Sequence, residues 1–134
     1  MKKKDLPLKL VLKKKWFDMY GNGKLEDYRE IKPYWITRLL ECNLPEEKPR
    51  ENSVVPDNIV YDIFENGYWA DDVLKAYRCQ FKTFKWAELI MGYRKNRPMK
   101  LAFVKEIKIG KPNPEWCEPE DVGKILFIIK LELL

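Results

Sequence analysis

The sequence predicts one α+β domain, because two kinds of hydrophobic spacing occur along a chain of single-domain length. Apolar residues alternate or run together, as in strands, at 8–12, 86–94, 99–109 and 125–133. They recur at helical spacing at 16–20, 35–40 and 59–77. With 134 residues, of which 46% are hydrophobic, the chain can bury one core but has little room for a second. We therefore expect residues 1–134 to form a single domain.

The N-terminal part predicts a strand, a helix and a second strand. Residues 8–12 alternate as a short strand, and Trp16, Phe17 and Tyr20 then share one face of a helix over 13–20. The glycines at 21 and 23 end that helix. A strand over 25–31 follows, and its two faces both mix polar and apolar side chains: Leu25, Asp27, Arg29 and Ile31 on one, Glu26, Tyr28 and Glu30 on the other.

The middle of the chain predicts helices. Pro33 opens a helix whose apolar stripe ends before Asn43. Residues 43–53 are rich in Pro, Glu, Lys and Asn, which is typical of a surface loop. Asp57 is a suitable N-cap for a helix that Asn66 and Gly67 close, and a second amphipathic helix is expected over 70–79.

The C-terminal part predicts strands again. Residues 86–94 and 99–109 form a hairpin around a turn at 95–98. The segment 110–123 contains three prolines and is expected to be irregular, and 125–133 is apolar enough for a central strand.

Positive charge is concentrated in two blocks. Residues 1–15 carry seven Lys and one Asp, and residues 75–111 carry eleven basic and two acidic residues, whereas 16–74 and 112–134 are net acidic. If the two basic blocks meet in space, they form a surface suited to phosphate backbones; otherwise they are solvated faces.

Composition excludes several classes of site and location. The chain has no histidine, which excludes Ser-His-Asp catalysis and His-bound zinc. The cysteines at 42, 79 and 117 form no C-x-x-C pair, so we expect neither a zinc site nor a disulfide framework, and a reducing cytoplasm. No apolar stretch is long enough to span a bilayer, and no cofactor motif is present, so we expect no membrane contact and no cofactor.

Motifs at both ends of the chain resemble the ASCH domain family, in its phage- and prophage-associated branch. The longest is EDYREIKPYW at 26–35, preceded by KKWFDM at 14–19 and by Gly23 and Lys24. GYR at 92–94, NPEW at 113–116 and IIKL at 128–131 are similar to the closing elements of the family. The resemblance covers roughly residues 6–41 and 84–134, and 43–82 reads as a helical insertion atypical of the family.

The resemblance implies a small mixed β-barrel similar to the PUA fold, with five or six strands, packed helices and a basic cleft near the Gly-x-Lys loop. Its relatives are thought to bind RNA, so RNA or a modified nucleotide is the expected ligand. Some small members hydrolyse the acetyl amide of N4-acetylcytidine with a Lys, a Thr three residues later, and a Glu. Lys24 matches that Lys, but Asp27 stands at the position of the Thr nucleophile.

Each candidate residue has two interpretations. Lys24 either projects from its loop toward an anion or is a solvated hairpin lysine. Arg29 either binds a phosphate or base edge, or forms a charge pair with Asp27 on its own strand face. Trp116 is either a stacking or lid residue or a packed one. The expected nucleic-acid-binding residues are Lys24, Tyr28, Arg29, Lys32, Arg94, Asn96 and Trp116, with Arg97 beside them and Lys13 to Lys15 as an extension.

The carboxylates of the 25–31 strand allow other chemistries. Lys24, Glu26 and Asp27 are the candidate catalytic residues, with Lys24 as base or electrostatic clamp. Glu26 and Glu30 are acid/base groups if buried together, or exposed partners of residues such as Lys32. A metal site on these carboxylates is disfavoured, because no calcium-type loop is present.

Three functions are consistent with the sequence. The first is a binding module for RNA or a modified nucleotide. The second is an enzyme of the same fold, an amidohydrolase of the N4-acetylcytidine type or a ribonuclease. The third is a phage accessory protein that docks a protein partner through 43–82.

Overall fold

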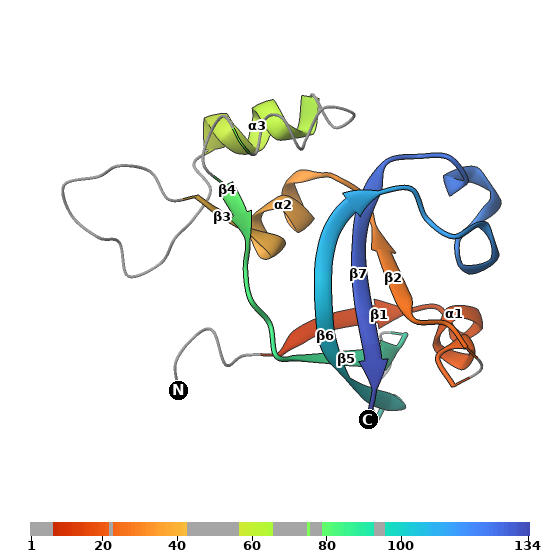
Figure 1. Cartoon of the computed structure of the whole chain (residues 1–134). Helices are drawn as coiled ribbons and strands as arrows, with labels where there is room; N and C mark the ends of the chain where they lie inside the picture. The colour runs from red at the N-terminus through yellow and green to blue at the C-terminus, as the bar shows by residue number, and fades with distance from the viewer. Residues whose placement is uncertain (1–6, 22, 43–56, 66–74, 76–78, 93–95) are drawn as a thin grey trace.

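A computed structural model describes residues 7–21, 23–42, 57–65, 75, 79–92 and 96–134. It confirms the α+β class: the described chain forms a curled five-stranded mixed sheet, a two-stranded sheet and three α-helices (Figure 1). The strands are β1 (Leu8–Leu12), β2 (Glu26–Arg29), β3 (Leu40–Cys42), β4 (Cys79–Phe81), β5 (Trp86–Met91), β6 (Met99–Gly110) and β7 (Leu126–Leu133). The helices are α1 (Lys14–Met19), α2 (Pro33–Leu39) and α3 (Asp57–Glu65).

The large sheet has the strand order β1-β5-β6-β7-β2. β1 and β5 are parallel, and the other neighbouring pairs are antiparallel. β7 lies between β6 and β2, so the expectation of an interior final strand is confirmed. The expected β5–β6 hairpin is also confirmed.

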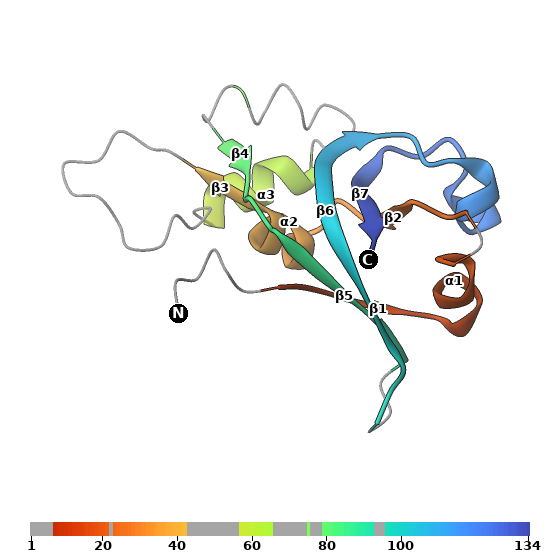
Figure 2. The same ribbon diagram turned by 60° about the horizontal axis from the view of Figure 1, so that its bottom comes forward.

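The sheet curls into a half-barrel, and β6 makes the bend (Figure 2). Its register against β7 shifts between Val104 and Glu106, which places an extra residue in β6 at the curve. Such a bulge increases local twist and bends the strand. The curl is compatible with the barrel-like fold expected, and it leaves β1 and β2 as the two edges of the sheet.

One hydrophobic core joins the concave side of the sheet to the helices. β1 alternates as predicted, with Leu8, Leu10 and Leu12 buried. The core continues through α1, α2, α3 and the inward residues of β5 to β7, including Phe17, Trp35, Ile36, Leu39, Ile59, Ile63, Leu89, Phe127, Ile129 and Leu131. The described part of the 43–82 segment therefore packs into the same core as the rest of the chain.

The helices separate into two groups. α2 and α3 lie beside the small β3–β4 sheet on one side of the half-barrel, and α1 lies on the other side (Figures 1 and 2). α1 follows directly from β1, so the residues of α1 lie at the end of this edge strand.

The small β3–β4 sheet corrects three expectations. Leu40 begins β3 instead of continuing the helix, and Cys79 begins β4, where a helix was expected to end. Cys79 is also disulfide-bonded, and Cys42 is its backbone partner in the antiparallel register. The expectation of no disulfide was wrong for Cys79, because separation in sequence does not reveal which strands pair. The cysteine argument for a cytoplasmic location is thereby lost, and that location stays a prediction.

One further expectation was incomplete, and two lie largely outside the described residues. The loop after β6 contains two short 3-10 turns, at Pro114–Trp116 and Pro119–Asp121, each with a proline at its first position, where the missing N–H costs nothing. The helix expected over 70–79 falls largely outside the described residues, as does the loop at 43–53. In the described part of the chain, no helix is long and apolar enough to cross a membrane.

Candidate functional site

Lys24 occupies the turn between α1 and β2. Gly23 has a φ of 104°, a left-handed conformation that glycine adopts without steric cost. The turn then closes through a hydrogen bond from the Lys24 N–H to the Met19 carbonyl, at 3.1 Å. The backbone therefore folds back under α1, and the Lys24 side chain begins beside that helix.

The Lys24 side chain points inward and is only 3% exposed. Its Nζ lies 4.6 Å from the ring centre of Trp16, 4.8 Å from that of Tyr20 and 6.0 Å from that of Tyr28. Aromatic faces attract cations at such distances. The solvated hairpin lysine is therefore excluded, and the four residues together form what we call the Lys24 site.

The Lys24 ammonium has no hydrogen-bond or ion-pair partner among the described residues, although rings surround it. In the same part of the chain, every side-chain nitrogen or oxygen that is fully enclosed has a hydrogen-bond partner. Nζ is therefore not completely enclosed by the described residues. The rings of Trp16, Tyr20 and Tyr28 are its neighbours, and its hydrogen-bonding capacity is unused within that part of the chain.

Burial lowers the pKa of Lys24 from its ordinary value of 10.5 to about 8. The charges of Asp27, Cys117 and Glu118 act in the opposite direction, and Arg29 adds to the lowering. Desolvation dominates because Asp27, which is 2% exposed, pairs with Arg29 and not with Lys24. The site thus holds a cation that the surrounding residues only partly compensate.

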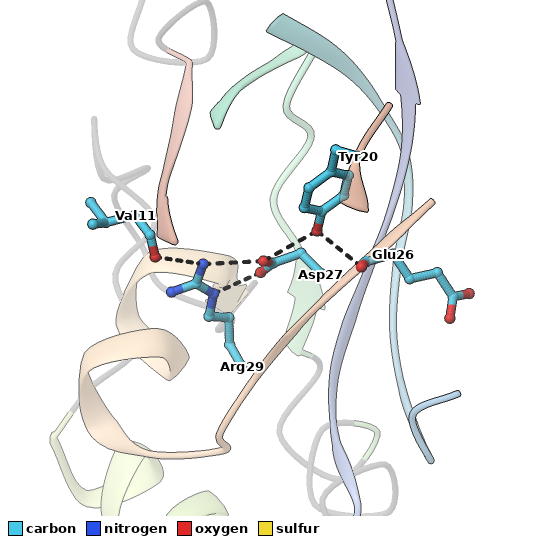
Figure 3. Close-up of polar contacts among 5 residues, drawn as sticks. All are labelled: Val11, Tyr20, Glu26, Asp27 and Arg29. Atoms are coloured by element: carbon cyan, nitrogen blue, oxygen red, sulfur yellow. Dashed lines mark hydrogen bonds and ion pairs between the residues drawn. The ribbon is translucent and has the colours of Figure 1, made fainter. Parts of the chain in front are cut away.

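Asp27 and Arg29 form a fork on one face of β2 (Figure 3). Arg29 Nε lies 2.6 Å from Asp27 Oδ2, and Arg29 Nη2 lies 3.1 Å from Asp27 Oδ1. The guanidinium also lies 4.8 Å from the ring centre of Trp35. The charge-pair interpretation of Arg29 is therefore the one present in the structure, and Trp35 is a core residue, 8% exposed.

The same guanidinium connects the two edges of the half-barrel. Arg29 Nη2 donates to the carbonyl of Val11 at 3.1 Å, although β1 and β2 are opposite edges of the sheet (Figure 3). We call Asp27, Arg29 and the Val11 carbonyl the edge latch. Tyr20 joins it, because its hydroxyl lies 3.4 Å from Asp27 Oδ1 and 2.9 Å from the Glu26 carbonyl. Burial raises the pKa of Tyr20 far above its ordinary range, so the phenol stays a donor.

The other face of β2 holds the loop that covers the Lys24 site. Tyr28 donates its hydroxyl proton to Glu26 Oε1 at 2.6 Å and accepts from the Asn113 N–H at 3.0 Å. Burial and the bond to Glu26 raise the pKa of Tyr28 above its ordinary range. Asn113 in turn caps the first 3-10 turn through its side chain and the Glu115 N–H. β2 therefore positions the start of loop 111–125.

The same loop is also fixed to α1. Glu118 Oε1 accepts from Trp16 Nε1 at 3.1 Å and from Lys13 Nζ at 3.3 Å. These two bonds lower the pKa of Glu118, which stays ionised. Cys117, buried beside them, is a free thiol whose pKa burial raises. The loop thus places Cys117 and Glu118 close enough to Lys24 for their charges to act on it.

The remaining expected ligand-binding residues lie elsewhere. Lys32 is exposed after β2 and lies 4.0 Å from Glu30, the exposed pairing considered for that glutamate. Asn96 is exposed at the β5–β6 turn with a φ of 60°, and Arg97 donates to the Gly92 carbonyl. Trp116 is half-buried in loop 111–125, and Arg94 lies outside the described residues. The structure therefore brings Lys24 and Tyr28 into one site, and leaves Lys32 and Asn96 outside it.

The two basic blocks do meet. β1 from the first block pairs in parallel with β5 from the second, with Leu12 opposite Met91. Beyond that pair, Lys100 reaches across to α1, where its Nζ donates to the Phe17 carbonyl at 2.9 Å. Lys13, just before α1, and Lys14 and Lys15 at its start are exposed, but Lys13 pairs with Glu118 and Lys14 with Asp18. The two basic segments therefore adjoin in the described residues, and acidic partners offset part of their charge.

Two of the site's aromatic residues were not among the expected ligand-binding residues. In the sequence, Trp16 and Tyr20 lie on one apolar helix face. Large aromatic residues with this spacing are also typical of a hydrophobic core, so the spacing does not show that their rings surround a lysine. Glu118 gave no signal, because its partners are about a hundred residues away. The described residues contain no cluster of metal-ligating side chains.

Comparisons with protein-family models, curated proteins and solved structures found no match to this chain. The geometry of the Lys24 site therefore carries the functional argument on its own.

Proposed function

We propose that this chain is a binding module for RNA or a modified nucleotide, and that Lys24 contributes the central contact. The observation that carries the proposal is the unpartnered ammonium of Lys24, buried among aromatic rings but not completely enclosed by the described residues. A phosphate oxygen or a base carbonyl of the ligand would accept a hydrogen bond from the Lys24 ammonium, which has no such acceptor among the described residues. A charge-assisted hydrogen bond made there is strong, because little water competes for it.

The surroundings of the site support this class of ligand. Lys15 lies beside the Lys24 site, because its Nζ is 4.4 Å from the ring centre of Trp16, and the second basic block adjoins the same helix through Lys100. Clustered basic side chains attract a polyanion through counterion release. Trp16 and Tyr28 contribute aromatic surface, and Trp116 on loop 111–125 is half-buried, which leaves part of its ring available for stacking on a base.

Arg29 has a different role in the proposal from the one expected. Its guanidinium is occupied by Asp27, Val11 and Trp35, so it positions β2 and the turn that holds Lys24. Tyr28 remains in the proposed binding set because it borders Nζ of Lys24.

A fluorescence-anisotropy titration tests the proposal. Single-stranded RNA, a structured RNA and matched DNA are titrated across a salt series against the wild type and Lys24→Met. Lys130→Met is the control, because Lys130 is a solvent-accessible lysine of β7 that lies outside both basic blocks and is paired with Glu106. We expect Lys24→Met to weaken RNA binding at least tenfold and Lys130→Met to weaken it only slightly. Equal weakening in both variants, or no RNA binding beyond that of any basic protein, would contradict the proposal.

An enzyme of the same site is the second candidate. The observation in its favour is the pKa of Lys24, about 8, which suits a general base near neutral pH. Asp27 stands where a Thr nucleophile was expected, and its carboxylate is held by Arg29, so an amidohydrolase would need an activated water. Incubation with acylated nucleosides or RNA, followed by chromatography, tests this candidate. Turnover that Lys24→Met abolishes would favour it over simple binding.

A further inference from the structure

The Lys24 side chain presents an amine as well as an ammonium. An ordinary lysine is held protonated by water and by carboxylate partners, and burial removes most of that water from Lys24. Its residue is 3% exposed, and three aromatic rings lie within 6.0 Å of Nζ. No described carboxylate forms an ion pair with it. Lysines that are desolvated in this way are the ones that proteins use as nucleophiles.

The groups facing Lys24 allow a neutral fraction at physiological pH. Asp27 and Arg29 face it from β2, Cys117 and Glu118 from loop 111–125, and Tyr20 from the end of α1. Their charges largely oppose one another, and burial then lowers the pKa of Lys24 to about 8. At pH 7 roughly a tenth of the side chains are neutral, compared with well under a thousandth for an exposed lysine.

We propose that Lys24 is a nucleophilic amine that captures small carbonyl compounds as imines. The rings of Trp16, Tyr20 and Tyr28 crowd Nζ, so the site suits small carbonyl compounds. Lys15, whose Nζ lies 4.4 Å from the ring centre of Trp16, favours carbonyl compounds that also carry a carboxylate. The chemical class that fits is therefore a small aldehyde or 2-oxo acid.

The reaction needs no group that the site lacks. The Nζ lone pair forms a bond to the carbonyl carbon, and the carbonyl π pair moves to oxygen. A proton transfers from nitrogen to that oxygen, which gives a carbinolamine. Loss of the hydroxyl with a second proton releases one water and leaves a C=N bond. Tyr20 and Tyr28, whose ring centres lie 4.8 and 6.0 Å from Nζ, are the hydroxyl-bearing residues of the site available to carry such protons.

This activity stands apart from nucleic-acid binding. Binding uses the ammonium, which predominates at pH 7, and imine formation uses the neutral minority of the same group. Failure of the RNA titration therefore leaves the carbonyl chemistry untouched, and failure of the carbonyl chemistry leaves the binding proposal untouched.

Reductive labelling of the wild-type chain tests the proposal. The protein is incubated with glyoxylate and cyanoborohydride, which reduces an imine to a stable secondary amine, and the labelled lysines are identified by peptide mass mapping at successive times. Lys14, with 76% of its side chain exposed, is the internal reference. We expect Lys24 to be labelled at least tenfold faster than Lys14 at pH 7. Labelling of Lys24 no faster than Lys14 would overturn the proposal.

A pH series separates reactivity from mere accessibility. The rate at Lys24 should rise between pH 6 and 8 and level off above about 8. A rate at Lys24 that keeps rising well above pH 8 would also overturn the proposal. Because both readings come from the wild type, the test does not depend on whether a variant folds.

Discussion

Replacement of Asp27 with Asn tests the edge latch. The side chain of Asp27 is 3% exposed and that of Arg29 is 16% exposed, and the two make hydrogen bonds of 2.6 and 3.1 Å. Asn keeps the shape but loses the charge, so the largely buried guanidinium is left without its counterion. Breaking a buried pair by removing one partner typically costs 3–5 kcal/mol. The partial exposure of Arg29 places the expected loss of unfolding free energy at about 3 kcal/mol.

Urea denaturation measures this loss, and a matched pair on the same sheet supplies the control. Lys105 and Glu132 also lie 2.6 Å apart, but their side chains are 59% and 57% exposed. Because exposed pairs contribute at most about 1 kcal/mol, we expect Glu132→Gln to change stability by less than that. In thermal unfolding, the Asp27→Asn loss corresponds to a fall in Tm of roughly 10 °C. Equal losses in the two variants would refute the reasoning that burial, and not distance, decides the strength of the latch.

Three further outcomes are expected. Lys24→Met should stabilise the protein by about 1–2 kcal/mol at pH 7, because it removes a desolvated ammonium at the expense of its ring contacts. The pKa of Lys24 falls from 10.5 to about 8 on folding, so the unfolded chain binds more protons than the folded chain between these pH values. The stability gained by Lys24→Met is therefore full below pH 8 and disappears by about pH 10.5. A stability loss above about 1 kcal/mol for this variant, measured by urea denaturation at pH 7, would contradict this reasoning. Tyr28→Phe leaves the Asn113 N–H without its acceptor and should speed hydrogen exchange of that amide about tenfold, whereas an unchanged rate would mean that Tyr28 does not hold the loop. In denaturant without reductant, alkylation should label Cys117 and leave Cys79 unlabelled until a reductant is added, because Cys79 is disulfide-bonded; labelling of Cys79 before reduction would disprove that disulfide.

Local patterns predicted most of the secondary structure. The alternation of Leu8, Leu10 and Leu12 gave β1 its buried face, and the glycines after Tyr20 marked the end of α1. The two faces of β2 were also predictable, because a period of two placed Asp27 beside Arg29 and Glu26 beside Tyr28. These contacts join residues that are two positions apart on one strand, so the strand period alone predicts which side chains lie side by side.

The contacts that create the site join distant segments. The parallel pairing of β1 with β5 brings the basic blocks together across about eighty residues, and no local pattern encodes it. The bond from Arg29 to Val11 depends on the curl of the sheet, which a bulge in β6 introduces. The Gly-x-Lys turn identified Lys24, but the inward direction of its side chain depends on α1 packing above it.

The site and the fold are therefore connected through β2. One face of β2 carries the edge latch, which holds the strand against β1. The other face carries Tyr28, which holds loop 111–125. Lys24 enters β2 from the turn just before it, so both attachments fix the position of its side chain. Lys24 is thus held in place by its neighbours, while its ammonium has ring contacts but no hydrogen bond or ion pair among the described residues.

The pKa of Lys24 is the most direct test of this account. With ¹³C-labelled lysine, the chemical shift of Cε can be followed by NMR as the pH is raised, and Lys24→Met identifies the signal. The account predicts that the signal removed by Lys24→Met titrates near 8. If that signal instead titrates at the ordinary lysine value of 10.5, Lys24 is solvated, and both the binding proposal and the carbonyl chemistry lose their foundation.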